Sequence, residues 1–339
     1  MKILMITPNF YPNIGGVEKH VLQVTNEIIK KGHQVTVLTR KYEKKLHDQE
    51  TINEINIIRF PLENLLNTWK WLYKNKTLIK NSDIVHCHDY RVFVFYYLPF
   101  RILFPFKHVF ITYHGFEGFV PIPRKIFLLR KLSELLTNGN ICIGKYIVKW
   151  YKTKTNHISY GGVIPSKITK VSNNSFTFIG RLEKDTGILL FIKAIKLIKD
   201  KIGVNLIVDI CGDGSLKDTI IKLNEENNLN IKIHGITNPD KFIDKNQFVF
   251  CTGYLGILES LIKKRLVFSV YDNPLKQDYL DSLDMTITCN SSEQLAEKII
   301  YYVDNFDETE KKIEKGYEFA KLQTWNKLSD TYLSLWGVK

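Results

Sequence analysis

The chain has 339 residues, enough for about two domains that each bury a core of their own. Hydrophobic residues make up 44% and charged residues 24%, which excludes a disordered chain and a polytopic membrane protein. The formal net charge of +13 lies entirely in the N-terminal half. Residues 1–165 hold 24 basic and 11 acidic residues, whereas residues 166–339 hold 24 of each. A basic half of this kind indicates an anionic partner.

The first half alternates short β-rich runs with amphipathic helical patterns, which is typical of parallel βαβ units. Helices are expected at Val17–Lys31, where Gly32 ends the pattern, and at Asn64–Lys80. The predicted strands are Lys2–Ile6, Gln34–Leu38, Ile55–Phe60, Ile84–His86, His108–Tyr113, Asn140–Ile143 and Asn156–Ser159.

After a turn at Ser159–Pro165 and a polar stretch at Lys167–Ser175, the same alternation starts again. Its predicted elements are strand Phe176–Ile179, helix Gly187–Lys199, strand Asn205–Cys211, helix Ser215–Asn227, strands Ile231–His234 and Phe248–Cys251, helix Ile257–Lys264 and strand Leu266–Val270. The sequence therefore predicts an α/β protein with two doubly wound, Rossmann-like domains, residues 1–165 and 166–322, and a last segment, 323–339. Such sheets bind ligands at the carboxyl ends of their strands, so we expect a cleft between the domains.

The cysteines and the apolar runs of the sequence indicate the cellular compartment of the protein. Five scattered cysteines without C-x-x-C spacing indicate a reduced chain with neither disulfides nor zinc. The apolar run at residues 1–7 is shorter than a signal peptide, and Val92–Phe106, broken by Arg101 and two prolines, is too short to span a membrane. We expect a cytoplasmic protein, either soluble or peripheral on the cytoplasmic membrane face.

Two glycines, Gly15 and Gly16, end the loop that follows the first predicted strand. Glycines let the backbone approach a ligand closely, and the unpaired amides at a helix N-terminus favour a phosphate. The pattern is not G-x-G-x-x-G, so a nicotinamide or flavin site is not predicted. A plain tight turn is the alternative.

Histidines end two further predicted strands. Strand alternation places His86 and His88 on one face, followed by Asp89, but a catalytic metal needs three converging ligands. We therefore expect a histidine and a carboxylate that line a cleft rather than a metal site. His114 precedes Gly115 at another strand end, where a structural and a functional role are about equally expected.

Arg181 follows the first strand of the second half, and arginine is scarce, with 8 against 40 lysines. Its planar guanidinium suits a diphosphate, and Lys184 adds positive charge. A surface pair of Arg181 with Glu183 is the alternative.

Two more strand-to-helix junctions lie in the second half. Gly212 opens a turn in which Ser215 is placed as an N-cap, and structural and ligand-binding roles remain equally open. Glu259 lies near the first turn of an apolar helix, where a carboxylate complements the helix dipole. It could equally accept two ribose hydroxyls while the preceding amides face a phosphate.

In order and spacing, these motifs resemble glycosyltransferase family 4, the retaining, GT-B-fold enzymes also described as glycosyl transferases group 1. The resemblance runs from Gly15–Glu18 to Thr324–Trp325. It implies two Rossmann-like domains that face each other across a cleft, with the acceptor on the N-terminal and the nucleotide sugar on the C-terminal domain. It also implies a last helix, about Trp325–Trp336, that crosses back onto the first domain.

The resemblance further implies roles for single residues. His114 would lie near the transferred sugar, while Arg181 and Lys184 would bind the diphosphate; these three are the candidate catalytic residues. The implied donor-binding residues are Gly15, Gly16, Arg181, Lys184, Gly212, Leu255, Gly256 and Glu259, with Glu259 on the ribose. His88, Asp89 and Glu117 are expected on the acceptor side.

Three positions depart from the family pattern, and the first is Gly161, where an asparagine is common. Thr186 stands where a phosphate-binding lysine normally precedes Gly187, and Lys184 is a hypothetical substitute. Cys251 stands at the first glutamate of the E-x7-E motif, which contacts the donor sugar. Three hypotheses therefore stay open: an active retaining glycosyltransferase, a non-catalytic partner subunit, and a sugar-nucleotide epimerase on the same fold.

The expected mechanism needs no metal and no other cofactor. No D-x-D motif is present, and Arg181, Lys184 and the Gly16 amide can stabilise the departing diphosphate. Without a carboxylate pair suited to double displacement, we favour a front-side transfer in which the leaving phosphate accepts the proton of the acceptor. The expected partners are a nucleotide-sugar donor and a glycan or lipid-linked acceptor. Nucleic acid is not expected, because the basic residues form no dense stripe.

Two segments, Val92–Phe106 and Phe116–Leu136, have the composition of an interfacial membrane segment. Their basic residues are Arg101, Lys107, Arg124, Lys125, Arg130 and Lys131. A buried helix with solvated charges is the alternative. Because the excess charge lies in the proposed acceptor domain, we expect that domain to attract an anionic membrane surface or a lipid-phosphate acceptor.

Overall fold

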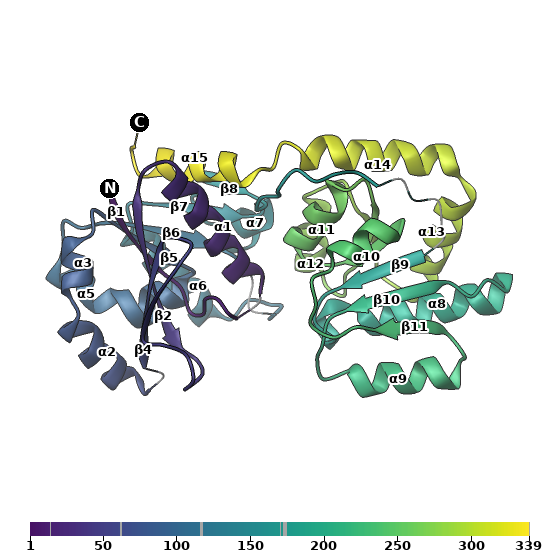
Figure 1. Cartoon of the computed structure of the whole chain (residues 1–339), viewed down its shortest axis with the longest axis horizontal. Coiled ribbons are helices and arrows are strands. Elements are labelled where there is room, and N and C mark those ends of the chain that lie inside the picture. The colour runs from purple at the N-terminus through teal and green to yellow at the C-terminus, as the bar shows by residue number, and fades with distance from the viewer. Residues whose placement is uncertain (14, 62, 116–117, 170, 172–174, 339) are drawn as a thin grey trace. The chain divides into compact units, whose positions relative to one another are not determined.

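The computed structural model describes residues 1–13, 15–61, 63–115, 118–169, 171 and 175–338. The chain divides into two compact units (Figure 1). Unit 1 consists of Met1–Gly162 and Trp325–Lys339, and unit 2 of Val163–Thr324. The division lies three residues before the predicted boundary, and the final helix belongs to unit 1.

Unit 1 is built on an eight-stranded sheet in the order β3-β4-β2-β1-β5-β6-β7-β8. The strands are β1 (Lys2–Ile6), β2 (Gln34–Lys41), β3 (Gln49–Ile52), β4 (Ile55–Pro61), β5 (Ile84–His88), β6 (His108–Tyr113), β7 (Gly139–Ile143) and β8 (His157–Ser159). Neighbouring strands are parallel except β3 and β4. Because β1 lies between β2 and β5, the chain changes direction beside it, which is where open α/β sheets bind ligands.

Strand β3 is an element that the sequence analysis missed. It is short, polar and at most half-buried, so it lacks the alternation that marks a strand. Asn53 and Glu54 join it to β4, both with positive φ, as a two-residue hairpin requires. No glycine stands in this turn, so the usual sequence signal for a hairpin is absent.

The helices of unit 1 are α1 (Gly16–Lys30), α2 (Leu65–Lys74), α3 (Thr77–Asn81), α4 (Tyr90–Val92), the π-helix η1 (Phe93–Tyr97), α5 (Leu98–Leu103), α6 (Arg124–Leu135), α7 (Lys145–Tyr151) and α15 (Trp325–Leu335). The single helix predicted at Asn64–Lys80 is two helices. The side-chain amide of Asn75 donates to the carbonyl of Trp71, 2.9 Å away, at the end of α2.

The apolar stretch 92–106 lies partly in the core and partly at the surface. Val92, Phe93, Tyr97 and Phe100 are buried, whereas four other large apolar side chains are exposed: Phe95, Ile102, Leu103 and Phe106. The buried residues anchor the stretch in unit 1, and a membrane contact of the exposed ones stays a prediction. None of the helices in the described part of the chain has the length and apolar character needed to span a bilayer.

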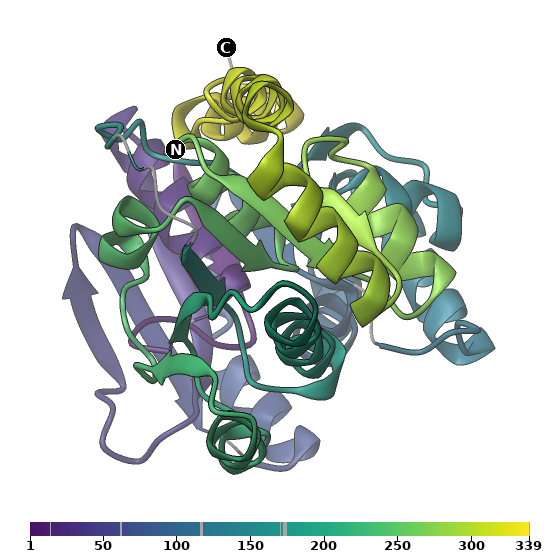
Figure 2. The same ribbon diagram turned by 90° about the vertical axis from the view of Figure 1, so that its right-hand side faces the viewer.

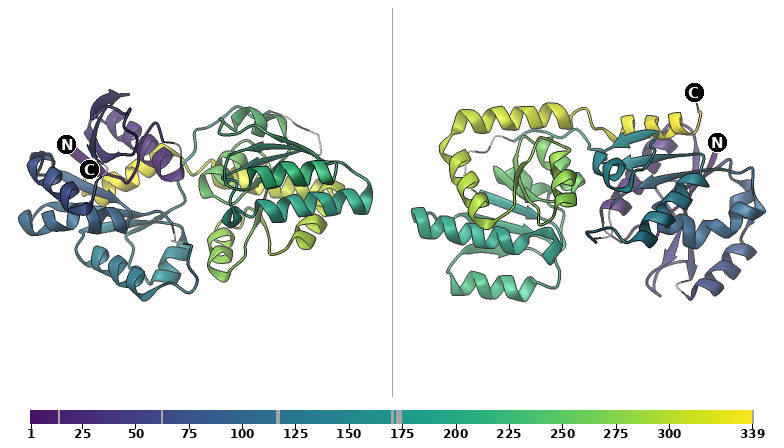
Figure 3. Two further views of the ribbon diagram at one scale, coloured as in Figure 1. Left: turned by 90° about the horizontal axis from the view of Figure 1, so that it is seen from below. Right: turned by 180° about the vertical axis from the view of Figure 1, so that it is seen from behind.

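The last helix, α15, packs along α1, as Figures 1 and 3 show. Its Trp325 and Tyr332 are buried, and Lys31 forms an ion pair with Asp330. Gly162 is required beside it, because a Cβ at this position would lie 2.6 Å from the Trp325 ring. The helix is thus an integral part of unit 1.

Unit 2 contains a six-stranded parallel sheet in the order β11-β10-β9-β12-β13-β14 (Figure 2). Its elements are β9 (Ser175–Ile179), the 3-10 turn η2 (Lys184–Thr186), α8 (Ile188–Ile202), β10 (Ile207–Cys211), α9 (Lys217–Glu226), β11 (Asn230–Ile233), α10 (Asp240–Lys245), β12 (Phe248–Cys251), α11 (Tyr254–Leu261), β13 (Leu266–Val270), α12 (Pro274–Asp281), β14 (Ile287–Cys289), α13 (Ser292–Asp304) and α14 (Phe306–Ala320). The three-residue β14 is too short to show a periodic pattern, so the sequence does not predict it. The two largely parallel sheets with their helices confirm the predicted α/β class.

The core of unit 2 depends on aromatic packing between sheet and helix. Phe178 and Phe250, on the neighbouring strands β9 and β12, stack on each other and on Phe191 of α8. Helix α8 also packs against α13, while α11 packs against α14. This packing fixes the strand ends from which the loops of the candidate site emerge.

Candidate functional site

Four loops meet at the carboxyl edge of the unit 2 sheet: residues 180–187, 212–216, 252–253 and 271–273. The first two loops are joined by backbone hydrogen bonds. The Leu182 amide donates to the carbonyl of Asp213, and the Leu216 amide donates to the carbonyl of Leu182, both over 2.9 Å. Strand order reverses between β9 and β12 at this edge, which makes it the expected ligand site of the unit.

Glycines allow these loops to touch. A Cβ on Gly212 would collide with the carbonyl oxygen of Gly180, and one on Gly214 would lie 2.6 Å from that of Leu182. The structure thus gives Gly212 a structural reason to be glycine. Contact of Gly212 with a donor stays a prediction.

Ser215 is not the helix cap that the sequence indicated, because α9 begins two residues later, at Lys217. Its amide donates to Glu183 Oε1 over 2.9 Å, and its hydroxyl donates to Oε2 over 2.6 Å. These hydrogen bonds lower the pKa of the Glu183 carboxyl. Glu183 is therefore occupied in joining the two loops.

Arg181 and Lys184 are both exposed at this edge. Arg181 Nη2 lies 2.7 Å from Asp185 Oδ2. The partner of Arg181 is therefore Asp185, whereas the alternative considered from the sequence was Glu183. Lys184 opens the short turn η2. An anion in solution can reach both cations.

Thr186 faces inward, and its hydroxyl donates to the carbonyl of Glu183 over 2.7 Å. The next residue, Gly187, has φ +76°, and a Cβ there would collide with Val270. Thr186 is therefore a structural part of the turn into α8. It cannot supply the positive charge that the family pattern has at this position.

Cys251 lies under the first turn of α11. Its thiol is 3.5 Å from the carbonyl oxygen of Gly253, to which it donates, and a Cβ on Gly256 would lie 2.5 Å from its sulfur. Burial raises the pKa of the thiol to about 12, so the group is neutral at physiological pH. The side chain points into the protein, and Gly256 has a packing role above it.

Helix α11 begins three residues earlier than predicted, at Tyr254. The Tyr254 amide donates to the Tyr279 hydroxyl over 3.0 Å, and the two rings stack 3.9 Å apart. This first amide is therefore already bonded, contrary to the expectation that it faces a phosphate. Leu255 lies in the first turn, and Glu259 in the second, so the dipole interpretation of Glu259 is wrong.

Lys276 is a residue of this edge that the sequence analysis missed. It is 7% exposed, lies in the first turn of α12, and its ammonium donates to the carbonyl of Asp185. Burial lowers its pKa, which Asp272 and Asp185 partly oppose. Asn273 and Pro274 mark the start of a helix, but no local pattern indicates that this helix reaches the loop after β9.

In unit 1, two arginines hold the loop between β1 and α1. Arg40 donates to the carbonyl of Pro8 and to the side chain of Asn9, and Arg59 donates to the carbonyl of Tyr11. A Cβ on Gly15 would collide with the Glu18 carboxylate, while nothing lies within 4 Å of such an atom on Gly16. The start of α1 at Gly16 is thus open to a ligand.

Four histidines form a cluster at the carboxyl edge of the unit 1 sheet: the buried His20, His86 and His88 and the half-buried His114. His88 Nδ1 lies 2.9 Å from His114 Nε2, and the ring centroids of His20 and His114 are 4.7 Å apart. Burial lowers the pKa of His20 and His86 to about 3, and those of His88 and His114 well below the usual range. All four rings are therefore neutral near pH 7.

The C-terminal helix completes this cluster. The Tyr332 hydroxyl lies 2.9 Å from His20 Nε2 and 2.8 Å from the hydroxyl of Thr112. Trp336 Nε1 donates to His86 Nδ1 over 3.1 Å. No cluster of three or more His, Cys, Asp or Glu side chains in the described part of the chain has the arrangement of a metal site.

The predicted acceptor-side residues have different positions. His88 is fully buried, which corrects the expectation that its side chain lines a cleft. It holds the ring of the half-buried His114, and its place on the acceptor side stays a prediction. Asp89, half-buried, has φ +84° and accepts from the Tyr90 amide over 2.6 Å. Glu117 lies outside the described residues.

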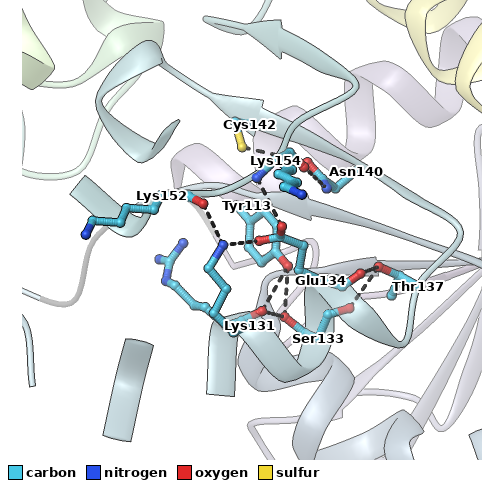
Figure 4. Close-up of polar contacts among 10 residues, drawn as sticks. Tyr113, Lys131, Ser133, Glu134, Thr137, Asn140, Cys142, Lys152 and Lys154 are labelled. Atoms are coloured by element: carbon cyan, nitrogen blue, oxygen red, sulfur yellow. Dashed lines mark hydrogen bonds and ion pairs between the residues drawn. The ribbon is translucent and has the colours of Figure 1, made fainter. Parts of the chain in front are cut away.

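Two basic residues of the proposed interfacial segment are structural. Arg130 is buried with its guanidinium 3.9 Å from the Tyr151 ring centroid, which contradicts a role at a membrane surface. Figure 4 shows Glu134 between Lys131 and the backbone of Lys154, and Lys131 bonded to the carbonyl of Lys152.

A hollow of about 700 Å³ adjoins this network, at the amino edge of the unit 1 sheet. It is lined by Lys131, Glu134, Leu135, Thr137, Asn138, Gly139, Asn140, Lys154, Thr155 and Asn156. Many of these polar groups bond to one another, and the hollow lies at the sheet edge opposite His114. We therefore do not assign it to the functional site.

Comparisons with known proteins show the family and the fold. Residues 14–166 match the family model described as Glycosyltransferase Family 4, and residues 164–254 match Glycosyl transferases group 1. A subunit of the phosphatidylinositol N-acetylglucosaminyltransferase of Homo sapiens is 25% identical over 184 residues, which cover 50% of this chain and 36% of that protein. The matched region thus spans about a third of that relative.

Two solved structures share the fold over almost the whole chain. Sucrose-phosphate synthase from Thermosynechococcus elongatus has a TM-score of 0.78 at 14% identity and covers 99% of this chain and 98% of that one. Anabaena Alr3699/HepE in complex with UDP-glucose has a TM-score of 0.77 at 12% identity and covers 98% and 99%. At these identities the likeness shows the fold alone.

Proposed function

This chain belongs to the glycosyltransferases of family 4 and group 1, with the GT-B fold, and we propose that it transfers a sugar with retention of anomeric configuration. The proposed donor is a nucleotide sugar, and the proposed acceptor is a glycan or a lipid-linked group. The observation that carries the proposal is the exposed pair of cations, Arg181 and Lys184, at the carboxyl edge of the unit 2 sheet.

The donor diphosphate would bind Arg181 by replacing the Asp185 carboxylate as its ion-pair partner. An exposed ion pair such as Arg181–Asp185 stabilises a protein by only about 0.2–1 kcal/mol. A diphosphate offers more negative charge and two oxygens to a planar guanidinium, so it can replace the Asp185 carboxylate. A solved neighbour of the same fold holds UDP-glucose, which supports a nucleotide-sugar donor.

Transfer would proceed at the front face of the sugar. Negative charge grows on the leaving diphosphate, and Arg181 and Lys184 stabilise it without a metal. The leaving phosphate accepts the proton of the attacking hydroxyl. His114 uses Nε2 for its hydrogen bond with His88, so we assign Nδ1 to a hydroxyl of the transferred sugar.

The acceptor is proposed to lie at an anionic membrane surface. Unit 1 has 26 basic and 12 acidic residues, whereas unit 2 has 22 and 23. Arg124 and Lys125 are exposed at the start of α6, and Leu128 follows one turn later with 66% of its side chain exposed. Basic and apolar side chains on one helix favour the surface of an anionic bilayer on the cytoplasmic side.

Arg181→Ala tests the donor assignment. We expect wild-type protein to be stabilised against heat by one member of a panel of UDP-, GDP-, ADP- and dTDP-sugars, because a ligand of the folded state raises stability. The variant should lose this stabilisation and at least tenfold in affinity. Lys193→Ala, which removes an exposed lysine of α8, is the matched control. Unchanged donor affinity in Arg181→Ala would contradict the assignment.

A non-catalytic partner subunit is the second candidate. It is favoured by Cys251 and Thr186, which both face inward where the family pattern has a charged side chain. Acceptor-dependent release of nucleoside diphosphate by the purified protein excludes this alternative. The same measurement separates transfer from epimerisation, since an epimerase forms its product from the donor alone.

A further inference from the structure

Lys276 is a buried cation with a neutral partner. Its ammonium donates to the backbone carbonyl of Asp185, and in the described part of the chain no carboxylate oxygen lies within 4.0 Å of it. Lysine is almost never fully buried unless it is paired with a charge. Asp272 and Asp185 act on the ammonium from a longer distance and offset only part of the cost of its burial.

The position of Lys276 in its helix also opposes a positive charge. The Asn273 side chain accepts from the Lys276 amide over 2.9 Å, which fixes the start of α12 and places Lys276 in the first turn. The positive end of the helix dipole disfavours a cation there. Burial and the helix dipole both disfavour the positive charge of Lys276. An anion bound nearby would stabilise that charge and so offset both effects.

The surroundings of Lys276 belong to the carboxyl edge of the sheet. Asp185, whose carbonyl it contacts, is the residue whose carboxylate pairs with Arg181. Tyr279, one turn further along α12, accepts from the first amide of α11. Helix α12 thus connects the loop after β9 with the start of α11, and Lys276 and Arg181 contact the same residue, Asp185.

We propose that Lys276 is a further diphosphate-binding residue of the donor site, which supplies from α12 the inward-facing ammonium that the loop around Thr186 lacks. This inference rests on the proposed function. When a diphosphate displaces the Asp185 carboxylate from Arg181, its oxygens come within the field of both cations. A charge held in a poorly solvated place acts more strongly on phosphate than an exposed one.

Binding of nucleotides by Lys276→Met tests the proposal. Methionine keeps an unbranched apolar side chain and removes the charge. Wild-type protein is first titrated with UDP, GDP, ADP and dTDP, and the variant is then titrated with the diphosphate that binds, its monophosphate and its nucleoside. We expect at least tenfold weaker diphosphate binding, a smaller loss for the monophosphate and less than twofold change for the nucleoside. The Tm should not fall, because a buried charge has been removed.

Lys263→Met is the matched control. Lys263 is as buried as Lys276 but forms ion pairs with Asp240 and Asp244 at 2.8 and 3.0 Å. Its loss should lower the Tm and leave diphosphate affinity unchanged. Equal diphosphate affinity in Lys276→Met and wild-type protein would overturn the inference while the proposed function stands. If wild-type protein binds none of the four diphosphates, the proposed function fails as well.

Discussion

Arg181 and Asp185 show how a single ion pair can regulate access to the candidate donor site. The pair is exposed, and Asp185 also offers its backbone carbonyl to Lys276. In the chain without ligand, the Asp185 carboxylate therefore occupies the guanidinium that we assign to the diphosphate. A competing carboxylate lowers the affinity for an anion by charge and by position.

Asp185→Asn should consequently strengthen donor binding. The substitution removes one negative charge from the site and leaves the backbone carbonyl that Lys276 contacts. We expect a several-fold lower Kd for the nucleoside diphosphate, with the largest gain at low ionic strength, because salt screens exposed charges. Titration calorimetry at two salt concentrations measures the effect. Asp218→Asn, on α9 of the same unit, controls for the change in net charge. A higher Kd in Asp185→Asn would show that Asp185 orients Arg181 rather than competing for it.

At the scale of elements, α6 has an exposed apolar stripe. Leu128, Leu132 and Leu135 lie at helical spacing and are 66%, 36% and 80% exposed. The inner side of the same helix is fixed by Arg130 and Ser133, which are buried. The helix is therefore firmly seated in unit 1 and presents apolar side chains outward, next to Arg124 and Lys125.

Leu128→Asp/Leu132→Asp tests whether this stripe contacts a membrane. We expect wild-type protein to cosediment with vesicles that contain phosphatidylserine at low salt, and the double variant to bind at least tenfold less, because apolar burial and charge attraction act together. Ile221→Asp, at a comparably exposed position on α9 of unit 2, should bind like wild-type protein. Failure of wild-type protein to bind these vesicles at low salt would leave the basic excess as ordinary solubility charge.

At the scale of the whole molecule, the stability of unit 1 depends on neutral histidines. His20, His86 and His88 are buried beside the half-buried His114, with Tyr332 of the last helix bonded to the cluster. Their folded-state pKa values lie below the unfolded value, so the unfolded chain binds more protons than the folded chain below about pH 6.5. Stability contributed by these groups is present above that pH and is lost as the pH falls toward the folded values.

Acidification should therefore unfold unit 1 well before its carboxylates titrate. For His20 and His86, whose pKa values fall to about 3, each histidine contributes a loss of about 1.4 kcal/mol per pH unit below pH 6. Thermal unfolding followed by circular dichroism between pH 7.5 and 4.5 measures the slope. His20→Gln keeps a side-chain group that can hydrogen-bond to Tyr332 but does not titrate. The pH dependence of its stability should therefore lack the contribution of one histidine, about 1.4 kcal/mol per pH unit. An identical slope in both proteins would contradict the prediction that protonation of His20 destabilises unit 1.

The amino-acid sequence was sufficient to predict the α/β class and most parallel strands, because buried strands carry continuous apolar runs that need no long-range information. It also placed His114 and Arg181 at strand ends and Gly16 at the start of a helix, where loops of such sheets meet ligands. Short or polar strands escaped it, as β3 shows, because their pairing depends on a neighbouring strand rather than on their own residues.

The tertiary structure, by contrast, decided which contacts each charged side chain makes. Asp185 rather than Glu183 pairs with Arg181. The Arg130 guanidinium packs over the Tyr151 ring inside unit 1 and does not face a membrane surface. Lys276 and Tyr332 join their sites from positions 91 and 312 residues away from Asp185 and His20. Local propensity acts within one element, whereas ion pairs and buried hydrogen bonds join elements far apart in the chain, and so the donor-site lysine and the histidine cluster emerge only when the chain is folded.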